Sequence, residues 1–488
     1  MGLRCGIEIT NVHIAVIVPA MTPSHSANSP EIEPLTATQG RILALAWPIM
    51  LSNITVPLLG LVDTAILGHL DDVTYLGAVA IGSQLFTFML WSFGFLRMGT
   101  TALTAQAYGR DTITQEVNGV FDVLKNALWL ALPLALLIAV IAQFMIPWLL
   151  PLFGDTQISN NSLLQTHAQQ YIEIRLFSVP AVLLQYTLVG WFIGLGKTRI
   201  PLLMLTSANL VNALLDYLFV YHLNMTSDGV AWGSVIGDYS ASIIGVICVW
   251  RYYQQNHQNN SSSISSAVLW LQRPHWQAIA PLVRINHQLF IRTLCLLSVF
   301  AFFTAQGARQ GEEILAVNAV FITLLLLISN ALDGFAHATE SLIGQALGCA
   351  RADLLKRILW LSGSNMVTMA ALLSIGFFSF GPTLLSVLTN NPGLLPRLEE
   401  YQGFLFLLPL VGVASYWLDG IFIGAARTAL MRNAMLAAAL LVFLPLWWLL
   451  LPFSNYGLWL AFYGFLVARA LFMLHGFLTL WRYPKKFM

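Results

Sequence analysis

Nine ionisable side chains lie inside long apolar runs of this sequence, where they could bind a cation. The acids are Asp63, Asp216, Asp238, Asp333, Glu340 and Asp419, and the bases are Arg97, Arg292 and Arg469. If such a run crosses a membrane, a charge within it costs roughly 2.5–3.5 kcal/mol, so it is kept where it has a function or a partner. Because the acids outnumber the bases, pairing with arginine leaves carboxylates that need a proton or a metal cation.

Two polar stripes occupy consecutive apolar runs in the first half of the chain. The first stripe is Asn209, Asn212 and Asp216, and the second is Ser234, Asp238 and Ser242. These spacings put each set on one face of a helix. At 1.5 Å per residue, Asp63 and Asp216 lie about 9 Å from the outer ends of their helices. We therefore interpret Asp63 and Asp216 as binding groups for a cation or proton.

Each of these residues also has a structural explanation. Asp63 could be a hydrated residue at a helix end, and Asn212 could bond a neighbouring helix. Asp238 either pairs with Arg97 or takes a direct part in binding. The three arginines are interpreted mostly as counter-ions.

A third polar stripe follows one apolar run of the second half. It comprises Asn330, Asp333, His337, Glu340 and Ser341. The spacing of Asp333, His337 and Glu340 would allow metal ligation, but no second ligand cluster accompanies them, so we expect no metal site. A polar wall facing a central cavity is the preferred interpretation, and a packed hydrogen-bond network is the alternative.

The elements that carry these stripes are apolar enough to lie in a bilayer. The chain has 488 residues, of which 57% are hydrophobic and 9% charged, against about 25% charged residues in soluble proteins. Twelve runs could cross roughly 30 Å of hydrocarbon. They cover residues 42–68, 75–107, 117–150, 164–195, 200–222, 229–253, 281–307, 313–347, 356–389, 400–425, 430–451 and 457–481. The composition and the runs predict an all-α integral membrane protein.

The chain divides into two halves that resemble each other. Residues 194–198 (GLGKT) match residues 424–428 (GAART), and residues 106–109 (QAYG) match residues 345–348 (QALG). Parallel six-helix repeats of this kind place a substrate path between them. We predict two pseudo-symmetric lobes of six helices.

Polar segments and basic residues set the boundaries and the orientation. We expect a flexible N-terminal extension at 1–40, lobes at 41–253 and 281–488, and a cytoplasmic linker at 254–280. About fifteen Lys and Arg residues fall on the side of the linker and only two on the other, which predicts that both termini are cytoplasmic.

Two prolines lie within the first apolar run, at Pro48 and Pro57. A proline removes an intrahelical hydrogen bond and kinks a helix. Pro48 is interpreted as a hinge coupled to Asp63, with a static kink as the alternative.

Several classes of protein are not supported. Residues 190–198 are one residue too long for a phosphate-binding loop, so energy would come from an ion gradient rather than a nucleotide. The net charge of +1 gives no reason to expect nucleic acid. The four cysteines are widely spaced, which predicts neither disulfides nor a zinc site. We expect no cofactor and a monomer.

Four segments resemble the multidrug and toxic compound extrusion (MATE) transporters, in the branch like DNA-damage-inducible protein F. They are residues 46–49 (AWPI), 62–70 (VDTAILGHL), 331–336 (ALDGFA) and 418–425 (LDGIFIGA). The resemblance extends from about residue 41 to the end of the chain. It implies an outward-directed antiporter whose two lobes rock around a central cavity.

The resemblance also implies which residues bind the coupling ion. Carried over by position, the cluster is Asp63, Tyr171, Asn212, Asp216 and Ser234, where Ser234 replaces a threonine. Some branches have a cation site in the second lobe with an acid on the seventh helix. This chain has Arg292 there, although Asp419 remains on the tenth helix, so we do not expect a complete sodium site in that lobe.

We therefore expect an inner-membrane multidrug antiporter. It would export amphipathic, often cationic organic compounds in exchange for protons, with sodium as the alternative ion. Burial without a counter-ion favours the protonated form of a carboxylate, so protonation of Asp63 and Asp216 would drive bending at Pro48. A flippase for a lipid-linked saccharide and an intramembrane metal-dependent enzyme are the alternatives.

Overall fold

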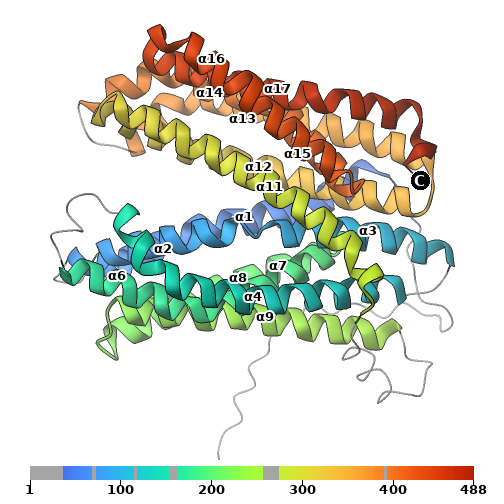
Figure 1. Ribbon diagram of the computed structural model, residues 1–488, viewed down its shortest axis with the longest axis horizontal. Helices are drawn as coiled ribbons and strands as arrows, with labels where there is room; N and C mark the ends of the chain where they lie inside the picture. Colours follow the sequence, from blue (N-terminus) through green and yellow to red (C-terminus); the bar gives the residue numbers. More distant parts are fainter. Residues whose placement is uncertain are drawn as a thin grey trace, which may run out of the picture. The chain divides into compact units, whose positions relative to one another are not determined.

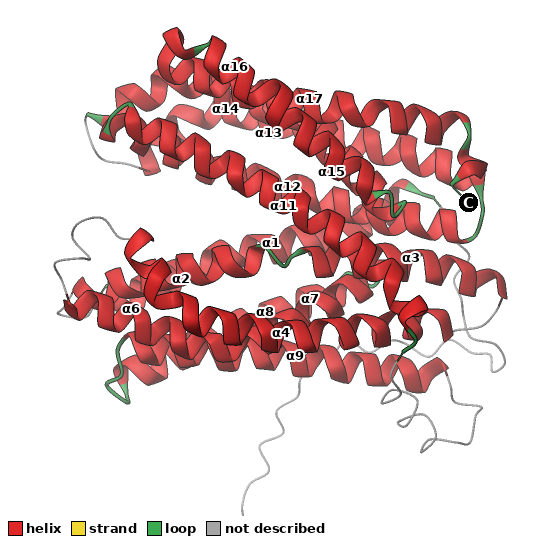
Figure 2. Cartoon of the chain, viewed as in Figure 1, coloured by secondary structure: helices red, strands yellow, loops and turns green. Residues whose placement is uncertain are grey.

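The computed structural model describes residues 37–68, 73–114, 118–153, 162–256, 274–388 and 393–487, and within them every element is a helix (Figure 2). The first 36 residues of the expected extension and residues 257–273 of the expected linker lie outside the described residues. The all-helical prediction is confirmed.

The first lobe contains the helices that precede the linker. They are α1 (Gln39–Leu67), α2 (Val73–Trp91), α3 (Phe95–Thr114), α4 (Asn118–Phe153), α6 (Ser162–Arg175), η1 (Leu176–Ser178), α7 (Val179–Gly194), α8 (Arg199–Tyr221) and α9 (Ser227–Asn256). Figure 1 shows α2, α4 and α6 to α9 lying side by side.

The second lobe contains the helices after the linker. They are α11 (Trp276–Arg309), α12 (Glu312–Gly348), α13 (Ala352–Leu388), α14 (Leu394–Gly424), α15 (Thr428–Ala437), η2 (Ala438–Phe443), α16 (Leu444–Leu449), η3 (Leu451–Phe453), α17 (Ser454–Arg482) and η4 (Pro484–Lys486). Among the described residues, eleven helical segments are long and apolar enough to span a membrane. The other expected span is α1, whose 29 residues extend about 44 Å.

Two of the expected continuous spans in the first lobe are interrupted. The run 75–107 breaks at Ser92–Gly94, where the amides of Phe93 and Gly94 bond carbonyls three residues back. The run 164–195 contains the short helix η1, and α7 restarts with proline in its first turn, where the missing amide hydrogen is tolerated. By contrast, α1 stays helical through Pro48 and Pro57. The break in the second run places Arg97 in the first turn of α3.

The two lobes meet where α3 packs against α12. A Cβ added to Gly109 would lie 2.2 Å from the carbonyl oxygen of Gln345, and one added to Gly348 would lie 2.2 Å from that of Gln106. Only glycine therefore allows the two backbones to approach so closely. The same glutamines form reciprocal bonds, since Gln106 donates to the Gly424 carbonyl (3.0 Å) and Gln345 donates to the Gly194 carbonyl (2.9 Å).

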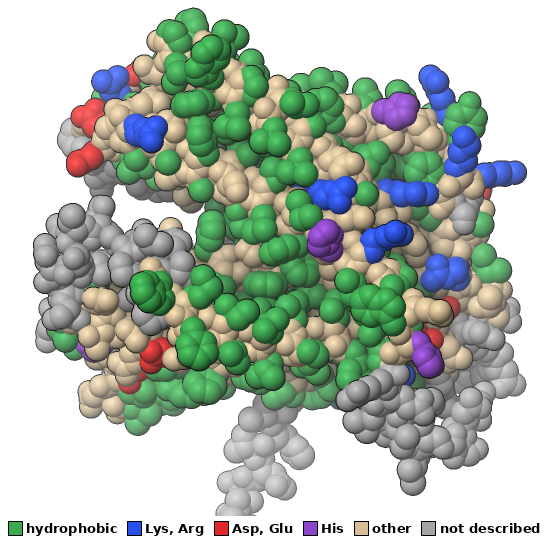
Figure 3. Space-filling view, viewed as in Figure 1, with side chains coloured by type: hydrophobic (Ala, Val, Ile, Leu, Met, Phe, Trp, Pro, Cys, Tyr) green, Lys and Arg blue, Asp and Glu red, His purple; other side chains and the backbone are tan. Residues whose placement is uncertain are grey.

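This contact lies at the end of the bundle where α3, α12 and α17 terminate, which we call the basic end. In Figure 3 most of the visible Lys and Arg side chains gather there, whereas the surface between the two groups of helices is indented at the opposite end. Residues 106–109 and 345–348, which match each other in the sequence, therefore contact each other across the two lobes and close the space between them at this end. α11 crosses between the two groups of helices in Figure 1 and also packs against α3.

The close contact between α3 and α12 leads to a prediction about Gly109. Gly109→Ala should lower the free energy of unfolding by about 1–3 kcal/mol, because the new methyl group meets backbone that cannot move aside. Gly376→Ala on α13 is the matched control, since nothing lies within 4 Å of that Cβ. Thermal unfolding in detergent measures both variants, and equal stability of the two would contradict the close-packing argument.

Candidate functional site

The polar residues of α8 and α9 form one buried cluster. Asp216 has no solvent exposure and Asn212 is nearly as buried. The Asn212 side-chain amide donates a 3.0 Å hydrogen bond to the Ser234 hydroxyl across the two helices. A Cβ at Gly233 would lie 2.0 Å from an Asp216 carboxylate oxygen, so glycine allows α9 to pack directly on this acid. Three of the predicted residues are therefore brought together by one pair of helices.

Asp63 lies on α1, which packs against α8, but its side chain lies outside the described residues. An open pocket of about 620 Å³ lies beside this position, between side chains of the two helices. It is lined by Val62, Ala65, Ile66, Tyr217, Tyr221 and His222. The Tyr221 hydroxyl donates a 3.3 Å hydrogen bond to the Ile66 carbonyl, so the end of α1 is tied to α8.

Three other residues of the sequence-based site are placed by their helices. Tyr171 is buried on α6, and its ring packs against Gly82 of α2, where a Cβ would lie 2.6 Å away. Asn209 is half-buried one turn before Asn212, and Pro48 is buried on α1. Tyr171 thus contacts α2, whereas the amide and hydroxyl cluster belongs to α8 and α9.

The predicted pairing of Asp238 with Arg97 is wrong. Asp238 accepts a 2.8 Å ion pair from Arg175, whose guanidinium also lies 4.3 Å from the centre of the Phe86 ring. Arg175 is the last residue of α6 and faces α9, a proximity that sequence spacing does not reveal. Arg175 nevertheless lies inside the expected span 164–195. A basic residue within an apolar run is the sequence signal that identifies it as a possible partner for a buried acid.

In the second lobe, Asp419 of α14 accepts ion pairs from both Arg292 of α11 and Arg469 of α17. All three residues are buried. Two guanidinium groups therefore hold the acid that a second-lobe cation site would need. The interpretation of Arg292 and Arg469 as counter-ions is confirmed.

The stripe on α12 is divided by burial. Asn330 and Asp333 are half-buried, whereas His337, Glu340 and Ser341 are buried. Arg97 contacts His337 at 2.7 Å, and His337 contacts Glu340 at 3.2 Å. The buried part is a packed hydrogen-bond network rather than the preferred polar wall. Among the residues that the structure describes, no group of three or more His, Cys, Asp or Glu side chains could hold a metal ion.

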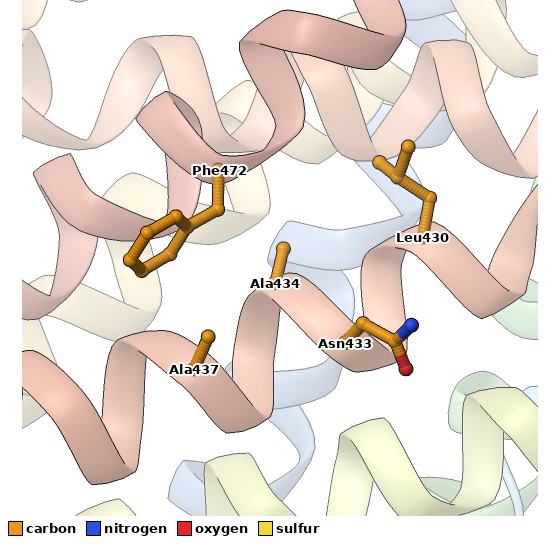
Figure 4. A pocket seen from close by; sticks show the side chains of 5 residues that line it. All are labelled: Leu430, Asn433, Ala434, Ala437 and Phe472. Carbon is orange, nitrogen blue, oxygen red and sulfur yellow. The ribbon is translucent and has the colours of Figure 1, made fainter.

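A second cavity, of about 410 Å³, lies between α15 and α17 (Figure 4). It is lined by Leu430, Asn433, Ala434, Ala437 and Phe472. The lining contains one amide and no ionisable side chain, so this cavity does not offer a cation-binding site.

Comparison with known proteins identifies the family. The sequence profile of the MatE family matches residues 48–218 and 289–449. The chain is also 37% identical to DNA damage-inducible protein F of Escherichia coli over 442 residues, which cover 90% of this chain and 91% of that protein. The chain belongs to the MATE family of transporters.

More distant MATE proteins agree. A probable multidrug resistance protein NorM of Acinetobacter baylyi is 24% identical over 402 residues, covering 79% of this chain and 81% of that one. A crystal structure of a MATE protein in the bent conformation superposes with a TM-score of 0.78 at 18% identity, covering 92% of this chain and 96% of that one. The MATE fold in two lobes is therefore confirmed, and the chain is a multi-pass membrane transporter rather than an enzyme.

The contribution of the Arg175–Asp238 ion pair to the stability of this MATE protein can be measured. Arg175→Met should lower the free energy of unfolding by about 1–3 kcal/mol, because Asp238 loses its cation in a largely buried site. Adding Asp238→Asn should recover part of the loss, which a double-mutant cycle in thermal unfolding measures.

The exposed pair Arg351–Asp353 supplies the control for this cycle. Arg351→Met should cause no measurable loss because water solvates both charges. Additive effects of Arg175→Met and Asp238→Asn would show that the buried pair is not coupled.

Proposed function

We propose that this MATE protein exports amphipathic, often cationic organic compounds in exchange for protons, with sodium as the alternative ion. The observation that carries the proposal is the fully buried carboxylate of Asp216, packed by α9 and next to the helix that bears Asp63. A carboxylate that is removed from water has to be compensated or neutralised. A proton that enters from the end opposite the basic end would neutralise it.

The cluster around Asp216 supplies the polarity that a bound ion needs. Asn212 and Ser234 already bond each other, so their dipoles are held beside the acid rather than free to rotate. Asp63 on α1 is the second acid of the proposal. Two neighbouring carboxylates disfavour ionisation of both, so one or two protons would be taken up together.

Bending of α1 is proposed to couple protonation to the cavity. Pro48 lies within a continuous helix in this structure, and its ring removes one hydrogen bond from the ladder. A related MATE protein has been solved in a conformation described as bent. Loss of the charge on Asp63 would release α1 from the polar cluster and allow it to bend at Pro48.

The ion gradient is sufficient for this work. Each proton that moves inward through 100 mV supplies about 2.3 kcal/mol, which supports a concentration ratio of a few tens for a neutral cargo. We further propose that the protein lies in a bacterial inner membrane as a monomer with both termini cytoplasmic, because the basic residues gather at one end.

The described side chains do not favour the flippase alternative. A pyrophosphate headgroup needs a strongly basic cavity, whereas Arg292 and Arg469 are both engaged by Asp419. Arg97 is engaged by His337. Multidrug efflux is thus the better explanation.

Efflux from proteoliposomes tests the ion site. A panel of cationic and neutral dyes should be exported under an imposed pH gradient, and both Asp63→Asn and Asp216→Asn should reduce export to the level of protein-free liposomes. Asp228→Asn is the matched control, because this acid caps the start of α9 by accepting from the Thr226 amide, a role that an amide oxygen also performs. Wild-type export by both variants would refute the proposal, and export driven only by a sodium gradient would establish the alternative ion.

The proposed hinge is tested by replacing Pro48 with alanine, and the same replacement at a second proline is the control. Pro48→Ala should slow efflux by roughly three- to tenfold while leaving dye binding unchanged, because a straight helix switches less readily. Pro382→Ala is the control, since Pro382 lies inside α13 and its side chain is exposed. Equal rates in the two variants would mean that bending at Pro48 is not part of the cycle.

A further inference from the structure

A chain of hydrogen bonds crosses from the first lobe to the second through three ionisable side chains. Nη1 of Arg97 on α3 lies 2.7 Å from Nε2 of His337 on α12. Nδ1 of His337 lies 3.2 Å from Oε2 of Glu340, one turn further along α12. The chain joins the lobes, and the ion-binding cluster of α8 and α9 does not include any of its members.

The donors and acceptors in this chain can be assigned from chemistry. A guanidinium group only donates, and Nη1 of Arg97 lies nearer to Nε2 of His337 (2.7 Å) than to Nδ1 (3.2 Å), so we take Nε2 as the acceptor. Nδ1 then carries the hydrogen of the neutral ring and donates to Glu340. Glu340 accepts this bond as a carboxylate, and Arg97 supplies the positive charge that compensates it through the imidazole.

Other charged groups near Glu340 are already engaged or lie further along the helices. Asp419 of α14 holds both Arg292 of α11 and Arg469 of α17, while Asp333 is half-buried about two turns before Glu340 on α12. Further ionisable groups on the packed elements are Tyr108, Arg110 and Asp111 on α3, Arg284, His287, Cys295 and Arg309 on α11, Tyr186 on α7, Arg397, Glu399, Glu400, Tyr401 and Tyr416 on α14, Arg41 and Asp63 on α1, and Asp353, Lys356 and Arg357 at the start of α13. Arg97 is thus the cation that faces Glu340.

Along α12, Glu340 lies between the half-buried Asp333 and the close contact at Gly348 at the basic end. Glu340 has no solvent exposure, whereas Arg97 is half-buried. A Cβ at Gly424 would lie 2.4 Å from the Glu340 carbonyl, and one at Gly344 would lie 2.5 Å from Ala105 of α3. On the basic-end side of Glu340, α12 therefore meets α14 and α3 in direct contact, and we infer that Glu340 exchanges a proton with that end only after α3 and α12 part.

Parting of these helices would separate the charges. Arg97 would leave with α3, and His337 and Glu340 would stay on α12. A carboxylate that loses its cation and remains among apolar side chains is more stable in the neutral form.

We propose that Glu340, with His337 and Arg97, forms a second proton-binding site that is ionised while the lobes are sealed at the basic end and protonated when they part there. A hydronium ion in the water that enters at the basic end transfers its proton to a Glu340 oxygen and becomes neutral water, and the O–H bond of Glu340 returns that proton to water as the helices close. The site therefore moves no net charge across the membrane. It makes opening at the basic end depend on the pH at that end.

The sign of this dependence follows from linkage. The parted state binds one more proton than the sealed state, so a fall in pH at the basic end favours parting, by at most about tenfold per pH unit.

Spin labels test the proposal in nanodiscs. One label replaces Arg251 at the end of α9 and the other replaces Arg482 at the end of α17, both exposed, in a chain whose four cysteines are changed to serine. Asp63→Asn and Asp216→Asn are included so that the proposed coupling site cannot titrate. The fraction with a long distance between labels is then measured by double electron–electron resonance between about pH 5 and about pH 9.

The parted fraction should rise as the pH falls, and Glu340→Gln should raise it at every pH and abolish the dependence. His337→Leu removes the acceptor for Arg97, so the dependence should remain but shift to higher pH. Asp353→Asn, an acid-to-amide change at the same end, should behave as the parent does.

Two results would overturn the proposal. One is an unchanged pH dependence in Glu340→Gln. The other is a flat response in His337→Leu while Glu340→Gln still titrates, which would assign the proton to the imidazole. Because both coupling acids are absent, either result is independent of whether the proposed ion exchange is correct.

Discussion

Compensation of buried charge within the protein is the constraint on which this structure depends. Lipid does not solvate a carboxylate or a guanidinium group, so each has to meet a partner on another helix. Direct ion pairs meet this need at two places: Asp238 pairs with Arg175, and Asp419 pairs with both Arg292 and Arg469. Glu340 is compensated indirectly. His337 connects it to Arg97, which lies across the boundary between the lobes.

The same constraint separates the two lobes in function. In the second lobe, Arg292 and Arg469 both hold Asp419, so these three charges are engaged with one another. In the first lobe, Asp216 lies beside an amide and a hydroxyl and next to the helix that carries Asp63. That difference is the physical reason why we propose ion exchange in the first lobe and a pH-dependent contact at the boundary between the lobes.

Close helix packing gives these interactions their geometry. Gly109 and Gly348 bring α3 and α12 into backbone contact, and Gln106 and Gln345 bond carbonyls of the opposite lobe. The two glutamines occupy matching positions of the repeat, so the internal symmetry of the chain becomes a symmetric seal. A seal of direct backbone contacts is rigid when closed, which suits a transporter that must not leak.

Composition and periodicity alone determined the all-helical membrane fold, the two lobes and the faces that carry Asn212, Asp216 and Ser234, because apolar length and helical spacing are local properties of the chain. They also showed which acids needed partners. Only the tertiary structure decided that Asp238 pairs with Arg175 rather than Arg97, that Arg97 reaches His337, and that the α12 stripe is divided between a half-buried and a buried part. Those choices depend on which helices become neighbours and how they rotate, and spacing along one helix does not specify the helix that faces it.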